Sequence, residues 1–396
     1  MKMNDAFLAS MHEAMQLLQT AGPMEATEAI QRALRQRSSV EVRAATAAPM
    51  PAQVVERLLT HDTAAARTGG VAGEPADAAA VHARGTDAAG PDSAAARAPA
   101  AQSPPARATA QAGHFSQRTF ANHAGTRSYK LYIPAGRHSE PIPLVVMLHG
   151  CTQDADDFAA GTRMNELADR LGFVVLYPIQ RADANASKCW NWFRPGDQQA
   201  ERGEPSLIAG MTREVIASHG IDIQRVYVVG LSAGGAMAAV LIQRYPGLFA
   251  AAGIHSGLPA GCAHDLPSAL GAMRGGKGIG RSRTGSAPLM APSRPMIVFH
   301  GDADKTVHPS NGSRLVAPFE QGEASTDKQR ETARAGHDYT RHRITTAAGI
   351  DAEYWVIHGA GHAWSGGSRR GTYTDPKGPD ASAEMLRFLL AHPRAD

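Results

Sequence analysis

Several features that would assign a chain to a class of protein are scarce in this sequence. Its 396 residues include 3 cysteines, which neither build a disulfide framework nor exclude one bridge. The 40 basic and 37 acidic residues leave a formal net charge of +3, which gives no support to a nucleic-acid partner. No uninterrupted apolar run approaches the roughly 18–20 residues of a membrane helix, so we expect no membrane span.

The first part of the chain is expected to lie outside the main domain. Residues 1–39 predict a helical hairpin, because Phe7, Met11 and Met15 repeat at helical spacing and Gly22-Pro23 then breaks the pattern. Such a hairpin cannot bury its apolar stripe alone, so we expect it to contact the main domain, a partner or an apolar surface. Residues 40–112 are rich in Ala, Pro and Gly, which predicts a disordered linker.

Residues 113–396 alternate between apolar runs and helical patterns. The expected strands are 128–133, 144–148, 173–177, 226–229, 249–254, 295–299, 340–346 and 352–357. The expected helices are 164–171, 206–219, 233–243, 313–319 and 380–390. Between them, residues 271–293 are rich in Gly, Arg and Ser and predict a surface loop. Strands that alternate with helices indicate an α/β fold with a mainly parallel sheet covered on both faces.

One pentapeptide stands at the centre of this pattern. Gly230-Leu231-Ser232-Ala233-Gly234 follows the apolar run 226–229 and precedes a helical segment. A serine between glycines at a strand-to-helix turn is typical of the nucleophile elbow of α/β-hydrolases. The pentapeptide alone is weak evidence, but the strand before it and the helix after it favour Ser232 as a nucleophile. We therefore expect an α/β-hydrolase fold.

A serine nucleophile needs a base and an acid that orients the base. In α/β-hydrolases these follow the serine in the order acid, then histidine, on loops after later strands. Asp304 lies after the strand that ends at residue 299, and His362 lies after the strand that ends at residue 357. Asp302 and His358 are the alternatives. His358 is closer to its strand, where a structural hydrogen bond is the better interpretation.

The oxyanion formed by an attacked ester needs backbone N–H donors that are fixed before reaction. The expected donors are Ala233, directly after the nucleophile, and Cys151 in the His149-Gly150-Cys151 loop that follows the strand 144–148. Thr152 is the alternative to Cys151.

Six motifs together resemble the poly(3-hydroxybutyrate) depolymerase family of esterases, to which feruloyl and acetylxylan esterases are related. They are LHGCTQ (148–153), CWNWF (189–193), GLSAGGAM (230–237), HGDADKTV (300–307), GAGHAWSGG (359–367) and DPKGPDAS (375–382). The resemblance covers about residues 115–392. It implies Ser232, Asp304 and His362 as the catalytic triad, and its HGxxDxxV pattern favours Asp304 over Asp302.

The same resemblance implies features of the substrate groove and of the compartment. It implies a disulfide between Cys151 and Cys189 and a groove lined by Trp190, whereas core or rim packing is the alternative for Trp190, Trp192 and Trp364. Secreted relatives imply an extracellular enzyme. The start of the chain lacks the apolar core of a secretory signal, so the cytoplasm is the alternative.

The sequence therefore predicts a serine carboxylic-ester hydrolase that works through an acyl-enzyme, with no cofactor and no metal. The expected substrate is a short-chain polyhydroxyalkanoate or its oligomers, and the alternative is a feruloyl or acetylated carbohydrate ester. A hypothesis of another class is a binding protein that attaches to a polymer granule or a partner through the hairpin at residues 1–39.

Overall fold

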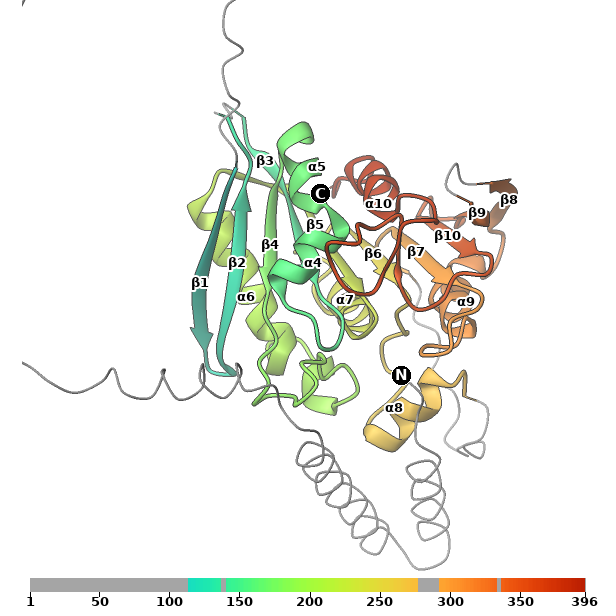
Figure 1. Ribbon diagram of the computed structural model, residues 1–396, viewed down its shortest axis with the longest axis horizontal. Coiled ribbons are helices and arrows are strands. Elements are labelled where there is room, and N and C mark those ends of the chain that lie inside the picture. Colours follow the sequence, from blue (N-terminus) through green and yellow to red (C-terminus); the bar gives the residue numbers. More distant parts are fainter. Residues whose placement is uncertain (1–112, 137–139, 277–291, 333–335, 396) are drawn as a thin grey trace, which may run out of the picture. The chain divides into compact units, whose positions relative to one another are not determined.

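A computed structural model describes residues 113–136, 140–276, 292–332 and 336–395 (Figure 1). The expected hairpin at residues 1–39, the expected linker at residues 40–112 and most of the expected loop at residues 271–293 lie outside the described residues. All the elements below belong to the segment that begins at residue 113.

The described strands form a 10-stranded sheet in the order β1-β2-β4-β3-β5-β6-β7-β10-β9-β8 (Figure 1). They are β1 (His114–Asn122), β2 (Gly125–Ile133), β3 (Ile142–Leu148), β4 (Val174–Pro178), β5 (Ile221–Leu231), β6 (Ala251–His255), β7 (Met296–Gly301), β8 (Ser325–Thr332), β9 (Asp338–Thr345) and β10 (Asp351–Ile357). The six central strands β4, β3, β5, β6, β7 and β10 pair in parallel with one another. The strands β1 and β2 at one edge and β9 and β8 at the other are antiparallel to their neighbours.

Helices cover both faces of this sheet. They are α4 (Ala155–Thr162), α5 (Met164–Leu171), α6 (Gly203–Ser218), α7 (Ala233–Arg244), α8 (Leu266–Met273), α9 (Ser310–Val316) and α10 (Ala381–Leu390), with the short 3-10 turns η1 (Pro195–Gln198) and η2 (Ala317–Glu320). A two-residue pairing, β11 (Trp364–Ser365) with β12 (Thr374–Asp375), lies outside the main sheet.

The hydrophobic core consists of two clusters, one on each face of the sheet. Within β3, Val146 contacts the cluster of α6, α7 and α9, whereas Val145 and Met147 contact the cluster of α4, α5 and α10. Successive side chains of a strand point to opposite faces, so a strand buried on both faces needs a continuous apolar sequence. This is why β3, β4 and the second half of β5 could be recognised as apolar runs.

Several elements differ from the expected ones. The structure adds β1, α4, α8 and β8, and it begins α6 at Gly203 instead of after Ser206, whose side chain predicted a helix cap. Ser206 does not cap this helix: its hydroxyl donates to Gly203 O inside the first turn. Edge strand β8 has the polar sequence STDKQRET, and residues 325–331 are exposed, so no apolar run marks this strand in the sequence.

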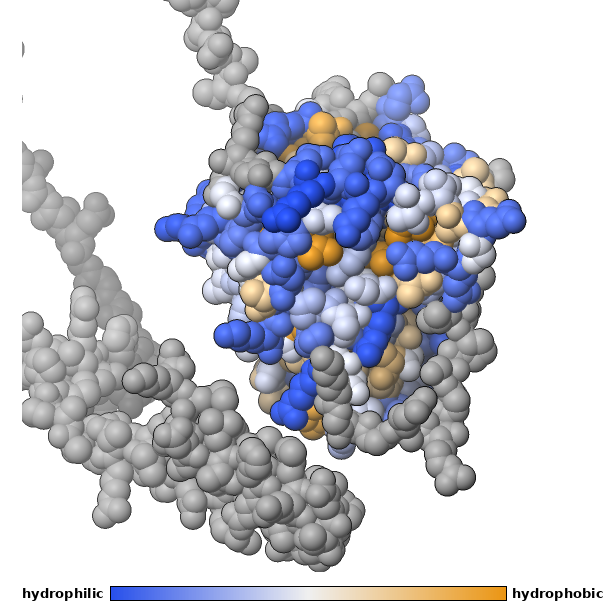
Figure 2. Space-filling view, turned by 90° about the vertical axis from the view of Figure 1, so that its right-hand side faces the viewer, coloured by the Kyte–Doolittle hydropathy of each residue, from blue (hydrophilic) through white to orange (hydrophobic). Residues whose placement is uncertain are grey.

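The surface is mainly polar on the side shown in Figure 2. Hydrophilic residues predominate there, and apolar ones form small separate patches among the coloured residues. Within the part of the chain that the structure describes, no helix combines the length and apolar character needed to cross a membrane.

Candidate active site

Ser232 lies in a sharp turn between β5 and α7, at the centre of the sheet. Its backbone has φ 56° and ψ −118°, a region that residues other than glycine rarely adopt. The turn is held because Ser232 N–H donates to His255 O of the neighbouring strand β6 at 2.9 Å. The serine is 8% exposed and precedes the N-terminus of α7, whose first N–H groups have no partner inside the helix.

The glycines of this turn are required by close backbone contacts. A Cβ atom at Gly234 would lie 2.1 Å from Leu148 O, at the end of β3. A Cβ atom at Gly230 would lie 2.3 Å from the carbonyl carbon of Gly234. Both distances are far below van der Waals contact, so larger residues would move the turn. The same contact presses the start of α7 against the loop that follows β3.

Asp304 and His362 come together from the loops after two adjacent parallel strands, β7 and β10. His362 Nδ1 donates to Asp304 Oδ2 at 2.7 Å, because an ionised carboxylate can only accept. The other carboxylate oxygen accepts from Thr306 N–H at 2.8 Å and from Val307 N–H at 2.9 Å. The Asp304 side chain has no exposed surface, whereas the His362 side chain is 11% exposed. The acid is therefore buried behind a partly accessible imidazole.

Asp304 stays ionised in spite of its burial. Burial alone would raise its pKa, but hydrogen bonds from His300, His362 and the Val307 N–H outweigh burial and hold the pKa well below its ordinary value. His300 Nε2 lies 3.5 Å from Asp304 Oδ2 and is bonded to Val307 O at 2.9 Å. The ionised carboxylate keeps the proton of His362 on Nδ1, which leaves Nε2 as a proton acceptor.

The two alternative residues form a second pair on the same loops. His358 Nδ1 donates to Asp302 Oδ2 at 2.9 Å, and His358 Nε2 is 2.8 Å from Thr340 Oγ1. The side chains of His358 and Asp302 are 30% and 41% exposed. Because both ring nitrogens of His358 have protein partners, this pair connects the two loops and is not free to accept a proton from a substrate.

The loop after β3 contains the residues expected to bind an oxyanion. Of the two expected donors, Thr152 N–H already donates to Ser187 O at 2.7 Å. Gly150 N–H is bonded to Gln153 Oε1 at 3.0 Å. Thr152 has φ 66°, so the backbone turns sharply just after Cys151.

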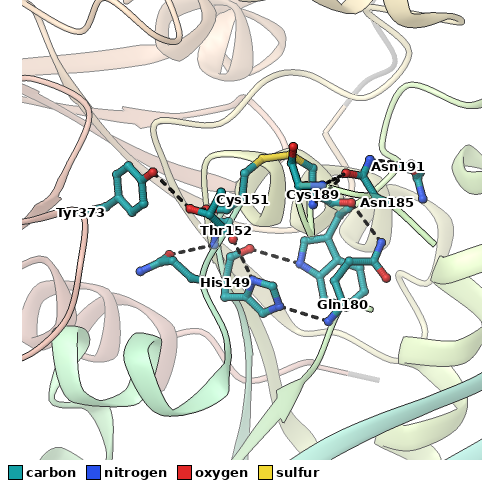
Figure 3. Close-up of a disulfide and its surroundings, with 12 residues drawn as sticks. His149, Cys151, Thr152, Gln180, Asn185, Cys189, Asn191 and Tyr373 are labelled. Carbon is teal, nitrogen blue, oxygen red and sulfur yellow. Dashed lines mark hydrogen bonds between the residues drawn. A yellow bond between two sulfur atoms is a disulfide. The ribbon is translucent and has the colours of Figure 1, made fainter. Parts of the chain in front are cut away.

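A disulfide joins Cys151 to Cys189 and ties this loop to the segment 185–191 (Figure 3). Trp190 follows Cys189 but does not line a groove as expected: it is 1% exposed. Its Nε1–H donates to His149 O at 3.1 Å, and its ring lies against the His149 ring with centroids 5.6 Å apart. An indole buried in this way supports the loop from below. Trp192 and Trp364 are also buried, at 6% and 1% exposed.

The sequence predicted no role for the side chains of two buried histidines near this site, His149 and His255. His149 donates from Nδ1 to Gly150 O at 2.7 Å and accepts at Nε2 from Gln180 N–H at 3.1 Å (Figure 3). His255 accepts at Nε2 from Ser365 N–H at 3.0 Å, and its ring stacks between Phe299 and Trp364.

Both imidazoles are uncharged in the folded protein. Burial lowers the pKa of His149 to about 4. Burial, followed by the neighbouring His300 and His362, lowers the pKa of His255 to about 3. Their position at strand ends was the available signal: His149, His255, His300 and His358 each lie at or next to the carboxyl end of a strand.

A buried carboxylate also supports the loop and was missed. Glu204 at the start of α6 accepts from Gln180 Nε2, from Asn191 Nδ2 at 2.7 Å and from Asn191 N–H at 2.7 Å. Burial and the neighbouring Asp197 raise the pKa of Glu204, although its hydrogen bonds act in the other direction. Gln180 N–H in turn donates to His149, so Glu204 is connected to the loop after β3 through Gln180. Through Asn191 it is connected to the segment 185–191.

The described residues contain no group of three or more His, Cys, Asp or Glu side chains arranged to hold a metal ion. Cys262 is a free thiol, and burial raises its pKa to about 12. Ser232, His362 and Asp304 offer a hydroxyl, an imidazole and a carboxylate, and the backbone N–H groups at the N-terminus of α7 lie beside them.

One protein-family model matches more than half of the chain. The family model described as "Esterase PHB depolymerase" matches residues 127–344. The match includes Cys151, Cys189, Ser232 and Asp304 and ends before His362, which is bonded to Asp304 in the structure.

Two curated proteins are similar in sequence to about half of the chain. Poly(3-hydroxyalkanoate) depolymerase C of Paucimonas lemoignei is 36% identical over 208 residues, which is 50% of this chain and 49% of that protein. Probable acetylxylan esterase A of Aspergillus fumigatus is 32% identical over 206 residues, which is 48% of this chain and 53% of that protein. The chain thus spans about half the length of these curated relatives.

The structure is similar to that of the acetyl xylan esterase from Aspergillus awamori. The TM-score is 0.51 at 21% sequence identity, and the match covers 69% of this chain and 98% of that one. The chain has the α/β-hydrolase fold that its strand–Ser232–helix turn predicted.

Proposed function

Because the chain belongs to the esterase PHB depolymerase family, we propose that it is a serine carboxylic-ester hydrolase with Ser232, His362 and Asp304 as its catalytic triad. The observation that carries the proposal is the 2.7 Å bond between His362 and the buried carboxylate of Asp304. The two residues lie on the loops that follow adjacent parallel strands. Ser232 also follows a parallel strand of this sheet, so all three residues lie at the carboxyl ends of the strands.

The proposed reaction has two halves. Ser232 Oγ attacks the ester carbonyl carbon while His362 Nε2 takes the hydroxyl proton, and Asp304 stabilises the imidazolium that forms. The N–H groups of Cys151 and Ala233 donate to the oxyanion. The C–O bond of the ester then breaks, and the alcohol leaves with the proton from His362. Water, deprotonated by His362, attacks the acyl-enzyme and releases the acid and Ser232.

Replacement of the nucleophile tests this mechanism. Ser232→Ala should lower kcat for p-nitrophenyl butyrate by at least about 10⁴-fold, because the remaining groups only bind and polarise the ester. Ser218→Ala, at the exposed end of α6, is the matched control and should keep full activity. A Ser232→Ala protein with wild-type turnover would refute the mechanism.

We propose a short-chain polyhydroxyalkanoate or its oligomers as the substrate. This choice rests on the family model and on the similarity to a protein named poly(3-hydroxyalkanoate) depolymerase C. Similarity to proteins named acetylxylan esterase supports a carbohydrate ester as the second candidate. Turnover of amorphous poly(3-hydroxybutyrate), methyl ferulate and acetylated xylan should be compared. Release of ferulate or acetate with no attack on the polymer would reverse the order.

We also propose that the segment before the hydrolase domain, residues 1–112, contacts an apolar surface such as a polymer granule. The support is the apolar stripe in the sequence of residues 1–39. Deletion of residues 1–112 should leave the hydrolysis of soluble esters nearly unchanged and reduce binding to polymer particles. Equal binding by the full and shortened chains would remove this idea.

A further inference from the structure

Among the described residues, five large hydrophobic side chains are exposed to solvent. Tyr373 is the aromatic one of these five. It is 46% exposed, whereas Trp190, which the sequence predicted to line the substrate groove, is 1% exposed. Its backbone has φ 51°, in the left-handed region that a bulky residue rarely adopts. Strained residues of this kind persist where the surrounding structure holds them, and they gather at functional sites.

Tyr373 lies directly beside the loop that carries Cys151. Its hydroxyl is 3.1 Å from Thr152 Oγ1, although 221 residues separate the two in the sequence (Figure 3). Thr152 Oγ1–H donates to Cys151 O at 2.6 Å, so the hydroxyl proton of Tyr373 must donate to Thr152 Oγ1. Thr152 also has a left-handed backbone, so the two strained residues meet through their hydroxyls.

Further hydrogen bonds fix the segment on both sides of the ring. Thr372 N–H donates to Asp157 Oδ1 at 2.8 Å, and Gln153 Nε2 donates to Thr372 O at 3.1 Å. Tyr373 O accepts from Trp364 N–H at 2.7 Å. Gln153 also accepts from Gly150 N–H, so one side chain connects this segment to the Cys151 loop. The exposed ring is therefore held in place before any ligand arrives.

A fixed, exposed aromatic ring next to the expected oxyanion donor has the properties of a substrate subsite. A tyrosine ring offers a large apolar face at low cost in side-chain entropy, and its hydroxyl is already occupied by Thr152. We infer that Tyr373 forms a subsite that contacts the aliphatic chain of an ester substrate beside the scissile carbonyl. Tyr373 would thus line the groove, as the sequence had predicted for Trp190. This inference rests on the proposed function.

Binding measured without turnover tests the subsite. In a Ser232→Ala background, a linear 3-hydroxybutyrate trimer is titrated calorimetrically into the parent and into the Tyr373→Ala variant. We expect Tyr373→Ala to weaken binding by about 3- to 10-fold, the range of an aromatic contact. Tyr373→Phe keeps the ring and should stay within about 2-fold of the parent. Ile223→Ala removes an exposed side chain near the start of β5, far along the strand from Ser232, and should bind like the parent.

Each other outcome overturns the subsite. Equal affinity of Tyr373→Ala and the parent removes the contact, as does the absence of trimer binding in the parent. A loss in Tyr373→Phe as large as that in Tyr373→Ala would assign the effect to the hydroxyl bond and not to the ring. The proposed function fails by a different measurement, since a wild-type chain that does not hydrolyse p-nitrophenyl butyrate refutes it whatever the trimer binding.

Discussion

Asp302 and Asp304 lie two residues apart in the sequence but differ in burial. The Asp304 carboxylate has no exposed side-chain surface and accepts hydrogen bonds from two backbone N–H groups and from His362. The Asp302 side chain is 41% exposed, and its histidine partner is engaged on both nitrogens. In a site shielded from water an ionised acid acts strongly on its partner, whereas solvent screens the exposed pair.

The aspartates should therefore respond differently to the same change. Asp304→Asn should lower kcat by about 10⁴-fold, because an amide can donate to the imidazole and favour the wrong tautomer of His362. Asp302→Asn should lower kcat by no more than about tenfold, the value of one or two ordinary hydrogen bonds. Steady-state kinetics with a soluble ester measures both. Equal losses in the two variants would contradict the assignment of Asp304 as the acid.

At the scale of elements, the site depends on the loop after β3, which a second loop segment holds in place. The segment after β3 is held by the disulfide from Cys151 to Cys189, by Trp190 beneath it and by the bond from Thr152 N–H to Ser187 O. These contacts all come from the segment 185–191, which Glu204 fixes in turn. The backbone around Cys151 is thus shaped by residues from a different part of the chain.

Loss of the disulfide should weaken both the fold and the activity. Cys189→Ser should lower the free energy of unfolding by up to about 4 kcal/mol, the chain-entropy value for two residues 38 apart in sequence. It should also lower kcat, because Cys151 N–H would be less well fixed. Urea unfolding and ester kinetics measure the two effects. Cys262→Ser, which removes the free thiol, is the control. Unchanged stability of Cys189→Ser would mean that the other contacts hold the loop alone.

At the scale of the whole molecule, two uncharged histidines buried beside the sheet make the fold sensitive to acid. The pKa values of His149 and His255 are about 4 and about 3, below the ordinary value of 6.5 for an unfolded chain. At pH values between the folded and the unfolded pKa, the unfolded chain binds more protons than the folded one, so the free energy of unfolding falls as the pH falls. The stability that comes from burying these two neutral imidazoles is complete above pH 6.5. It is lost as the pH drops from 6.5 toward 4 for His149 and toward 3 for His255.

Urea unfolding at several pH values should reveal this dependence. Each histidine should lower the free energy of unfolding by about 1.4 kcal/mol per pH unit below pH 6.5. His149→Gln should reduce this slope, although it should also cost stability at neutral pH because His149 is bonded on both nitrogens. His264→Gln changes a side chain that is 79% exposed and should leave the slope unchanged. The same slope in His149→Gln and the wild type would contradict the role of His149.

Much of the fold could be predicted because its signals are local. The strand Leu144–Leu148 is apolar throughout, since both of its faces are buried. Helix α5 was predicted with its observed bounds, Met164–Leu171, because Gly172 ends it in a left-handed conformation. Edge strand β8 was missed because its sequence is polar, and its pairing with β9 depends on the backbone. The start of α6 was misplaced because Ser206 has the side chain of a cap but bonds within the helix.

The sequence by itself determined that central apolar strands alternate with helices and that an elbow surrounds Ser232. It also narrowed the candidates for the acid and for the base to two residues each. Apolar runs, glycines and chain order are properties of neighbouring residues. Only the tertiary structure decided that the buried Asp304 is bonded to His362, that Thr152 N–H donates to Ser187 and that Trp190 lies under the loop after β3. It alone brought Tyr373 beside Thr152. These features depend on contacts between segments that are distant in the sequence. A local sequence pattern does not indicate which distant residues will contact each other or which of them will be buried.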